Sequence, residues 1–342
     1  MKKLYILSIA LFTLNVVNAQ WIQVWSDEFT TGPTIDPTKW IFDIGNGVNG
    51  WGNKEREYYT NRLDNAIISN GNLLIIAKNE DYDTSHYTSA RLKTKGLQSW
   101  KYGKIEARIK LQKGQGMWPA FWMMGDTSLI WPKCGEIDIM EHVNNNTDVV
   151  CNMFWDANLG HDYDCYEGHT ICDVSQFHVY SIEWDANAIK WFVDGNKYWE
   201  GNIKDSINNT EEFHFPFYIL MNAAVGGIWP GDPDSTTIFP DTTFIDYVRV
   251  YRDYPDGIKE SMIIKNIINI FPNPASTQLT IEAAQLTKES NLTILNLSGQ
   301  ELIRQQIKDI KTQIDISNLT SGIYFVKLIT DKTVEVRKIL KE

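Results

Sequence analysis

Residues 131–142 read Trp-Pro-Lys-Cys-Gly-Glu-Ile-Asp-Ile-Met-Glu-His and place three carboxylates, Glu136, Asp138 and Glu141, among Ile and Met. Side chains of a strand alternate between its faces, so the first two acids share a face and the Ile residues between them point to the core. Glu141 has the opposite parity. One extra residue, a β-bulge at 139–141, would bring it to the other two acids. The pattern predicts a strand that directs three carboxylates into a cleft.

Paired carboxylates in a cleft are what glycoside hydrolysis requires, because one acts as nucleophile and the other as acid/base, about 5–5.5 Å apart in retaining enzymes. Repulsion between the two keeps one protonated near neutral pH, which suits a general acid. The middle acid can hydrogen-bond Glu136 and tune it. The alternative is an edge strand whose acids face solvent. The surrounding motifs decide between the two interpretations.

These motifs resemble glycoside hydrolase family 16, in its branch with the pattern E-x-D-x-x-E, and most of all its β-1,3-glucanases (laminarinases). They are residues 50–60 (GWGNKEREYYT), 89–91 (SAR), 116–125 (GMWPAFWMMG) and 244–251 (FIDYVRVY). The resemblance covers about residues 21–252. It implies a retaining endo-β-1,3-glucanase with Glu136 as nucleophile, Asp138 as its assistant and Glu141 as acid/base.

Aromatic and polar residues around the acids are candidates for substrate binding. Trp118 and Trp122 are four apart on a strand and share a face, so they stack on sugar rings if that face is the cleft and pack in the core if it is not. Arg91 matches a substrate-binding arginine of the family, and its alternative is a surface salt bridge. The predicted substrate-binding set is Arg91, Trp118, Trp122, Trp131, Asn46, Trp51, His142, Asn222 and Trp229.

The chemistry needs no organic cofactor. Many members of the family carry a structural calcium, and the matching positions are Glu28, Gly71 and Asp246. Calcium takes oxygen ligands, some of them backbone carbonyls. The resemblance therefore implies a stabilising Ca²⁺, and the alternative is that Asp246 caps a turn.

Composition indicates what the protein binds. The 342 residues carry a net charge of −11, which argues against nucleic acid as a partner. Aromatic residues make up 12% of the chain and include 13 Trp, which favours a neutral carbohydrate ligand. We expect a monomer acting on a β-glucan polysaccharide. A mixed-linkage β-glucanase, another family 16 hydrolase or transglycosylase, and a non-catalytic glucan-binding protein remain as alternatives.

Short β-type runs broken by Gly, Asn, Asp and Pro fill residues 21–252, and no long amphipathic helix stands out. Asp194-Gly195 is a hairpin signal. Predicted strands include 73–77, 103–111, 177–184, 188–193 and 217–223. The expected fold is all-β, a jelly-roll sandwich with a concave substrate cleft.

Both ends of the chain carry further signals. Residues 1–19 read as a secretory signal peptide. After a turn-rich linker at 253–263, residues 264–342 are expected to form a small β-sandwich that resembles the C-terminal sorting domain of type IX secretion substrates. A carbohydrate-binding or spacer module is the alternative. The protein is therefore expected to be secreted or at the cell surface, with the secretion machinery as a partner.

Four cysteines remain to be assigned, and export permits disulfides. Cys165 and Cys172 could close a short loop, and Cys134 and Cys151 could lie on neighbouring strands. Free, buried thiols are the alternative.

Overall fold

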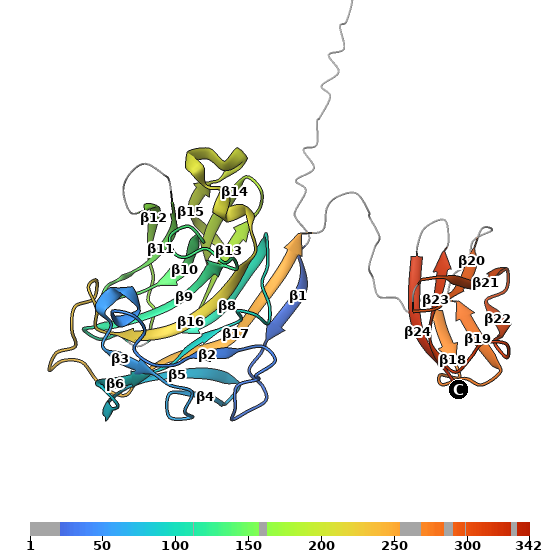
Figure 1. Ribbon diagram of the computed structural model, residues 1–342, viewed down its shortest axis with the longest axis horizontal. Helices are drawn as coiled ribbons and strands as arrows, with labels where there is room; N and C mark the ends of the chain where they lie inside the picture. Colours follow the sequence, from blue (N-terminus) through green and yellow to red (C-terminus); the bar gives the residue numbers. More distant parts are fainter. Residues whose placement is uncertain are drawn as a thin grey trace, which may run out of the picture. The chain divides into compact units, whose positions relative to one another are not determined.

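A computed structural model describes residues 21–111, 113–156, 163–253, 268–283, 290–297, 299–329 and 334–342. The expected signal peptide and residues 254–263 of the expected linker lie outside the described residues. The chain divides into two compact units that meet in sequence at residues 254 and 255, and each is described by itself (Figure 1). In the part of the chain that the structure describes, no helix has the length and apolar character needed to cross a membrane.

Two sheets form the first unit. The strands of the larger sheet are β1 (Trp21–Asp27), β3 (Glu57–Tyr59), β4 (Ala66–Ser69), β5 (Asn72–Tyr82), β6 (Ser85–Ser89), β8 (Gly103–Lys110), β13 (His178–Trp184), β14 (Ala188–Val193), β15 (Asn196–Asn202) and β17 (Asp241–Asp253). Their order is β15-β14-β13-β8-β17-β5-β6-β3, with β1 paired to β17 and β4 to β5.

The smaller sheet carries the candidate site. Its strands, in sheet order, are β12 (Asp164–Ile171), β11 (Asp148–Trp155), β10 (Glu136–Glu141), β9 (Met117–Gly125), β16 (Phe217–Val225), β7 (Arg91–Lys93) and β2 (Ile41–Asp43). Three short helical segments, Gly50–Lys54, Lys204–Asn209 and Glu211–His214, lie in the loops.

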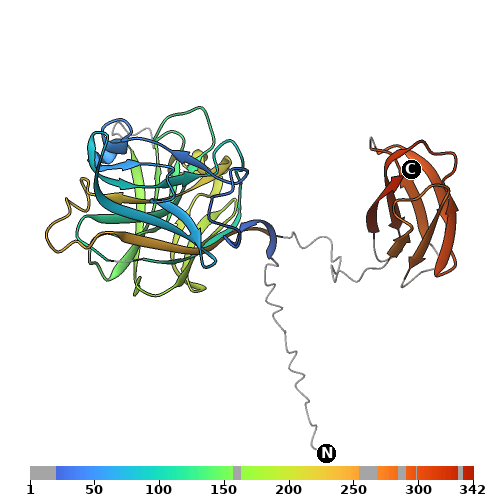
Figure 2. The ribbon, with the colours of Figure 1, turned by 90° about the horizontal axis from the view of Figure 1, so that it is seen from below.

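The core of the first unit lies between the two sheets, which stack face to face (Figures 1 and 2). Strand β9 shows why, because its residues alternate strictly between buried and half-buried. Phe121 and Met123 face the core, and Trp118 and Trp122 face the opposite side, toward the cleft. The predicted all-β sandwich is confirmed. The expected hairpin is also present, since Asp194 and Gly195 have φ of 49° and 75° between β14 and β15.

The second unit is a small β-sandwich. One sheet contains β18 (Ile268–Phe271), β19 (Gln278–Ala283) and β22 (Lys311–Asp315), and the other contains β21 (Glu301–Gln306), β20 (Asn291–Leu295), β23 (Gly322–Ile329) and β24 (Val334–Lys341). Its core is aliphatic and includes Leu279, Ile281, Leu292, Ile294 and Val326. This core shares no residue with that of the first unit.

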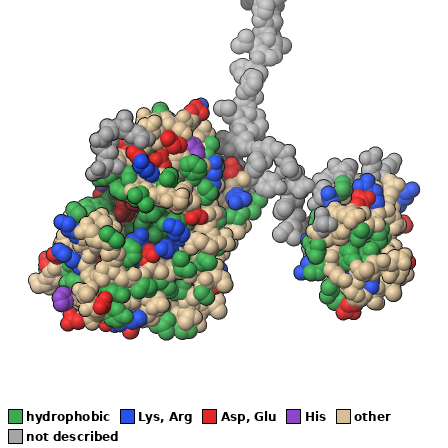
Figure 3. Space-filling view, viewed as in Figure 1, with side chains coloured by type: hydrophobic (Ala, Val, Ile, Leu, Met, Phe, Trp, Pro, Cys, Tyr) green, Lys and Arg blue, Asp and Glu red, His purple; other side chains and the backbone are tan. Residues whose placement is uncertain are grey.

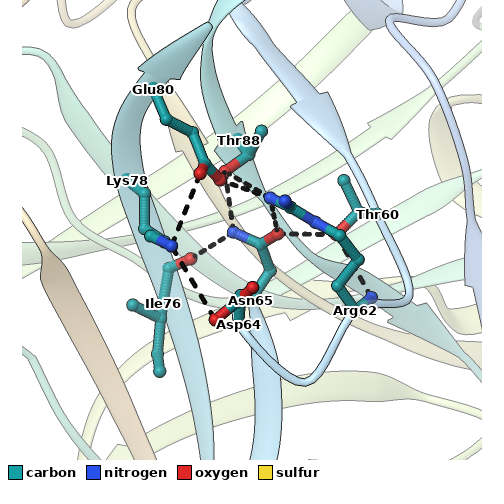
Figure 4. A network of polar contacts seen from close by, with 8 residues as sticks. All are labelled: Thr60, Arg62, Asp64, Asn65, Ile76, Lys78, Glu80 and Thr88. Atoms are coloured by element: carbon teal, nitrogen blue, oxygen red, sulfur yellow. Dashed lines mark hydrogen bonds and ion pairs between the residues drawn. The ribbon is translucent and has the colours of Figure 1, made fainter. Parts of the chain in front are cut away.

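A polar network fixes the loop that follows β3 (Figure 4). The buried Asn65 accepts a hydrogen bond from Arg62 Nη2 (2.8 Å) and donates one from Nδ2 to Thr88 Oγ1 on β6 (2.9 Å). Arg62 also forms an ion pair with Glu80 on β5. The loop is therefore held against β5 and β6, directly beyond Tyr59, whose hydroxyl reaches the candidate site.

All four cysteines are unpaired, so the suggested Cys165–Cys172 disulfide is wrong. Cys165 lies near the start of β12 and Cys172 follows its last residue. Seven residues of extended strand separate them by roughly 23 Å, far beyond the span of a disulfide. Cys134 and Cys151 are both buried as thiols.

Candidate active site

Strand β10 contains the predicted bulge. Asp138 pairs with Trp122 of β9 and Met140 with the next residue, Phe121, so Ile139 is the extra residue. Ile139 and Met140 are both buried in the core. Glu141 then follows on the same face as the other two acids, and all three line one cleft.

The cleft crosses the outer face of the smaller sheet and has a volume of about 750 Å³. The space-filling view shows a hollow with acidic atoms inside and hydrophobic side chains around it (Figure 3). Strands β9 to β12 and β16 supply its floor, and loops supply aromatic walls. The predicted residues that line it are Trp51, Arg91, Trp118, Trp122, Trp131, Glu136, Asp138, Glu141, Asn222 and Trp229.

Two predicted residues do not line the cleft. Asn46 instead donates its side-chain amide to the carbonyl of Glu57 (3.3 Å) and to Ser85 Oγ, so it holds its loop against β3 and β6. His142 follows Glu141, and alternation turns it to the opposite face. It is 1% exposed, and its Nδ1 lies 3.0 Å from the carbonyl oxygen of Asp148. Its role as a cleft-wall donor was therefore wrong.

Glu141 is held by two donors. Trp118 Nε1 donates to Oε1 (2.9 Å), and Asn152 Nδ2 donates to Oε2 (2.8 Å). Burial raises the pKa of Glu141 to about 7, and these two hydrogen bonds limit the rise because they favour the charged form. A carboxyl group with this pKa can give and take a proton near neutral pH, as an acid/base requires.

Asp138 is the acid best placed to keep a proton. Burial raises its pKa well above the usual value, and repulsion from Glu141 and Glu136 adds to the effect. Its Oδ2 is buried and finds no hydrogen-bond partner among the described residues. A proton on this carboxyl, donated to Glu136, would satisfy the oxygen and leave Glu136 as the accepting carboxylate.

Glu136 remains partly exposed to the cleft. Burial raises its pKa to about 8, and repulsion from Glu141 adds to the rise, while Arg91 and hydrogen bonds from Trp131 and Asp138 oppose it. This pKa alone would not make Glu136 the more acidic of the two glutamates. Glu136 is partly exposed and Asp138 is only 2% exposed, so we assign the shared proton to Asp138 and the negative charge to Glu136.

Arg91 is fixed by three contacts. Its guanidinium carbon lies 4.8 Å from the ring centres of both Trp51 and Trp122, and its Nε lies 3.2 Å from Asp43 Oδ2. The guanidinium is thus held in place by the two rings and by Asp43. It presents a positive charge to the cleft at the β7 end of the sheet.

Asn222 positions Trp122. Its Oδ1 accepts a hydrogen bond from Trp122 Nε1 (2.8 Å), and its Nδ2 donates to Tyr59 OH (3.2 Å). The hydroxyl of Tyr59 donates in turn to Glu55 Oε2 (3.1 Å). This chain of hydrogen bonds fixes the orientation of the Trp122 indole in the cleft.

Several cleft residues were missed by the sequence analysis: Asn53, Glu55, Asn152, Phe154, Tyr163, Cys165 and Glu167. Asn152 shows the reason, because it is opposite Asp138 in the β10–β11 pairing. The sequence would place Asn152 beside Asp138 only if the register of β10 and β11 were known. Asn53 and Glu55, by contrast, lie within the 50–60 motif quoted for the resemblance, which could have indicated them.

Two of the predicted calcium ligands, Glu28 and Asp246, accept hydrogen bonds from arginines. Glu28 accepts two hydrogen bonds from Arg249 (3.0 and 2.8 Å), and Asp246 Oδ2 accepts one from Arg108 (2.7 Å). The described residues contain no group of three or more His, Cys, Asp or Glu that could hold a metal. A calcium here would depend mainly on backbone carbonyls, including that of Gly71, and it stays a prediction.

Comparison with known families gives two matches. The family model described as glycosyl hydrolases family 16 matches residues 53–249. The model of the secretion system C-terminal sorting domain matches residues 269–342.

Individual relatives match the same first region. A beta-glucanase of Rhodothermus marinus is 43% identical over 249 residues, which are 68% of this chain and 85% of that protein. The clotting factor G alpha subunit of Tachypleus tridentatus is 46% identical over 238 residues, and the match spans 34% of that longer protein. The solved catalytic domain of an endo-1,3-beta-glucanase from Thermotoga petrophila is 44% identical, with a TM-score of 0.63, covering 69% of this chain and 99% of that domain.

Proposed function

Since the chain belongs to glycosyl hydrolases family 16, we propose that it is a secreted endo-β-1,3-glucanase that hydrolyses laminarin-type β-glucans with retention of configuration. The observation that carries the proposal is the set of three acids on one face of β10, inside a cleft with tryptophan walls. Glucanases and laminarinases among the relatives support the choice of substrate.

The proposed mechanism has two steps, in which Glu136 is the nucleophile and Glu141 acts first as acid and then as base. Glu136 attacks the anomeric carbon while Glu141 gives its proton to the departing glycosidic oxygen, which releases the first product and leaves a glycosyl ester on Glu136. Glu141, now a carboxylate, takes a proton from water, which attacks the ester and restores Glu136. Protonated Asp138 donates a hydrogen bond to Glu136. Because Asp138 is then neutral, the three acids carry one negative charge fewer. The two inversions at the anomeric carbon give overall retention. These groups complete the reaction without a cofactor.

The C-terminal unit directs export. Residues 269–342 belong to the secretion system C-terminal sorting domain, which indicates type IX secretion and a secreted or cell-surface protein. A signal peptide at residues 1–19 would provide the first export step. The net charge of −11 and the acidic and aromatic side chains that line the cleft support polysaccharide, and not nucleic acid, as the partner. The enzyme is proposed to act as a monomer.

The direct test is release of reducing sugar from laminarin. Wild type should release it, and Glu136→Gln and Glu141→Gln should lower kcat by about 10²–10⁴-fold because each loses an acid, base or nucleophile. Glu200→Gln, at an exposed position on β15, is the control and should match wild type. NMR of the first products should show the β-anomer.

A glucan-binding protein without catalysis would use the same cleft. It would bind laminarin and release no sugar, and that result from wild type would contradict the proposal. A panel of laminarin, mixed-linkage glucan, agarose and carrageenan separates the remaining family 16 activities by their products.

A further inference from the structure

Three aromatic side chains meet at the β12 end of the cleft. The ring centres of Trp131 and Tyr163 lie 5.1 Å apart, those of Phe154 and Tyr163 5.5 Å, and those of Trp131 and Phe154 6.2 Å. The rings are inclined to one another by 51° to 71°, so they form a corner and not a flat stack. We call these three residues the aromatic corner.

The aromatic corner is open to the cleft. All three residues line it, and Trp131 and Tyr163 are 41% and 42% exposed. Aromatic rings that served only to fill the core would be covered, as Trp155 and Trp191 are. Exposed rings grouped inside a cleft indicate a surface that a ligand covers.

Strand register places the aromatic corner beside the nucleophile. Glu136 of β10 is paired with Phe154 of β11, which is paired with Cys165 of β12. Neighbouring strands are about 4.8 Å apart, so the row extends roughly 10 Å from the strand of the nucleophile. Arg91, Asn222 and Trp51 lie on the other side of the acids, toward β7.

The occupant should be neutral and have an apolar face. Glu167 lies in the same part of the cleft, and the catalytic acids adjoin it, so an anionic ligand would be repelled. A glucosyl ring is uncharged and offers C–H groups that pack on aromatic faces. A continuous β-glucan chain bound at the acids would reach the aromatic corner with its next units.

We propose that Trp131, Phe154 and Tyr163 form a stacking subsite that holds a glucosyl unit of the polysaccharide beyond the cleavage point, at the β12 end of the cleft. This inference rests on the proposed function and adds a binding element to it. The subsite should improve the binding of long chains and contribute nothing to chains that are too short to reach it.

Cys165 provides a reporter at the same place. It lines the cleft, is exposed, and is paired with Phe154 across the strands. The other three cysteines are 0% to 6% exposed. A thiol reagent should therefore modify Cys165 first, and a sugar held in the aromatic corner should shield it.

The test measures alkylation of Cys165 in the full-length Glu136→Gln variant, in which bound substrate is not consumed. Laminarihexaose at ten times its Kd should slow the reaction about tenfold, as expected if only the free form reacts. Laminaribiose should give little protection. Tyr163→Ala should remove the protection by hexaose, and Ile171→Ala, at the other end of β12 and 85% exposed, should leave it unchanged. Cys165→Ser shows the background of labelling.

Turnover gives a second readout. With Glu136 intact, Tyr163→Ala should raise KM for long laminari-oligosaccharides by about tenfold, with little change for the shortest substrate that is cleaved. Phe154→Ala should act in the same direction, and Tyr163→Ala keeps the test valid if loss of the Phe154 ring impairs folding.

Two failures are distinguishable. If tryptophan fluorescence shows that hexaose binds while Cys165 reacts at its unliganded rate, the subsite is refuted and the proposed function stands. If hexaose does not bind and wild type does not cleave laminarin, the proposed function itself is wrong.

Discussion

At the scale of single residues, Glu141 shows how burial and hydrogen bonding are balanced. Burial alone would favour a permanently neutral carboxyl group, and a fully solvated carboxylate would hold no proton at neutral pH. Trp118 and Asn152 each donate to one of its oxygens and bring its pKa back to about 7. The acid/base is thus tuned by neighbours that take no part in bond breaking.

Removal of one donor should shift the pH profile. In Asn152→Ala the charged form of Glu141 loses a hydrogen bond, so its pKa rises. The alkaline limb of kcat/KM, where the acid loses its proton, should move up by about one unit, since about 1–2 kcal/mol is lost. The profile is measured with a soluble laminari-oligosaccharide, with Asn79→Ala, at an exposed position on β5, as control. If the pKa of the alkaline limb did not change, a group other than Glu141 would be responsible for that limb.

The acids could be predicted from the sequence, and many of their neighbours could not. Parity within residues 136–141 was enough to require a bulge, because Glu141 would otherwise face the core. Asn152 depends on the pairing of β10 with β11, which local sequence does not encode. His142 was misplaced because a histidine beside a catalytic acid suggests chemistry, whereas alternation sends it to the core.

At the scale of elements, the bulge in β10 has an unexpected property. Asp138, Met140 and Glu141 pair with three consecutive residues of β9, which are Trp122, Phe121 and Ala120. Ile139 has no partner in this pairing. Removal of Ile139 would therefore leave a regular strand in which Glu141 still faces the cleft. In the native sequence the bulge absorbs the extra core residue Ile139, so that Glu141 keeps the face of the other two acids.

Deletion of Ile139 tests this point. We expect a folded protein, less stable by about 2–4 kcal/mol because a buried side chain is lost, with more activity than Glu141→Gln. Urea unfolding and laminarin hydrolysis are the measurements. A folded deletion variant as inactive as Glu141→Gln would show that the bulge sets the position of the carboxylate within the cleft.

The network around Asn65 should matter for stability more than for catalysis. Asn65→Ala removes the buried amide that bonds Thr60, Arg62, Thr88 and the carbonyl of Ile76, so the free energy of unfolding should fall by about 2–3 kcal/mol. Urea denaturation measures the loss against Asn79→Ala. A drop below 0.5 kcal/mol, on the order of a surface change, would mean that water replaces the amide at this site.

At the scale of the whole molecule, the two units have separate cores. A protein ending at Asp253 retains every residue of the first core and of the cleft. We expect it to keep kcat/KM for laminarin and its melting temperature, measured by calorimetry against the full chain. A lower melting temperature would mean that the first unit does not reach its full stability by itself. The turn-rich linker at 253–263 predicted the boundary between the units, and the resemblance to a sorting domain predicted what the second unit is.

The unpaired cysteines have a consequence for production. No covalent cross-link restricts the unfolded chain, so the stability of the fold comes from its apolar core and its hydrogen bonds. Folding should then require no oxidant. Active enzyme should accumulate in a reducing cytoplasm, and millimolar reductant should leave its turnover intact.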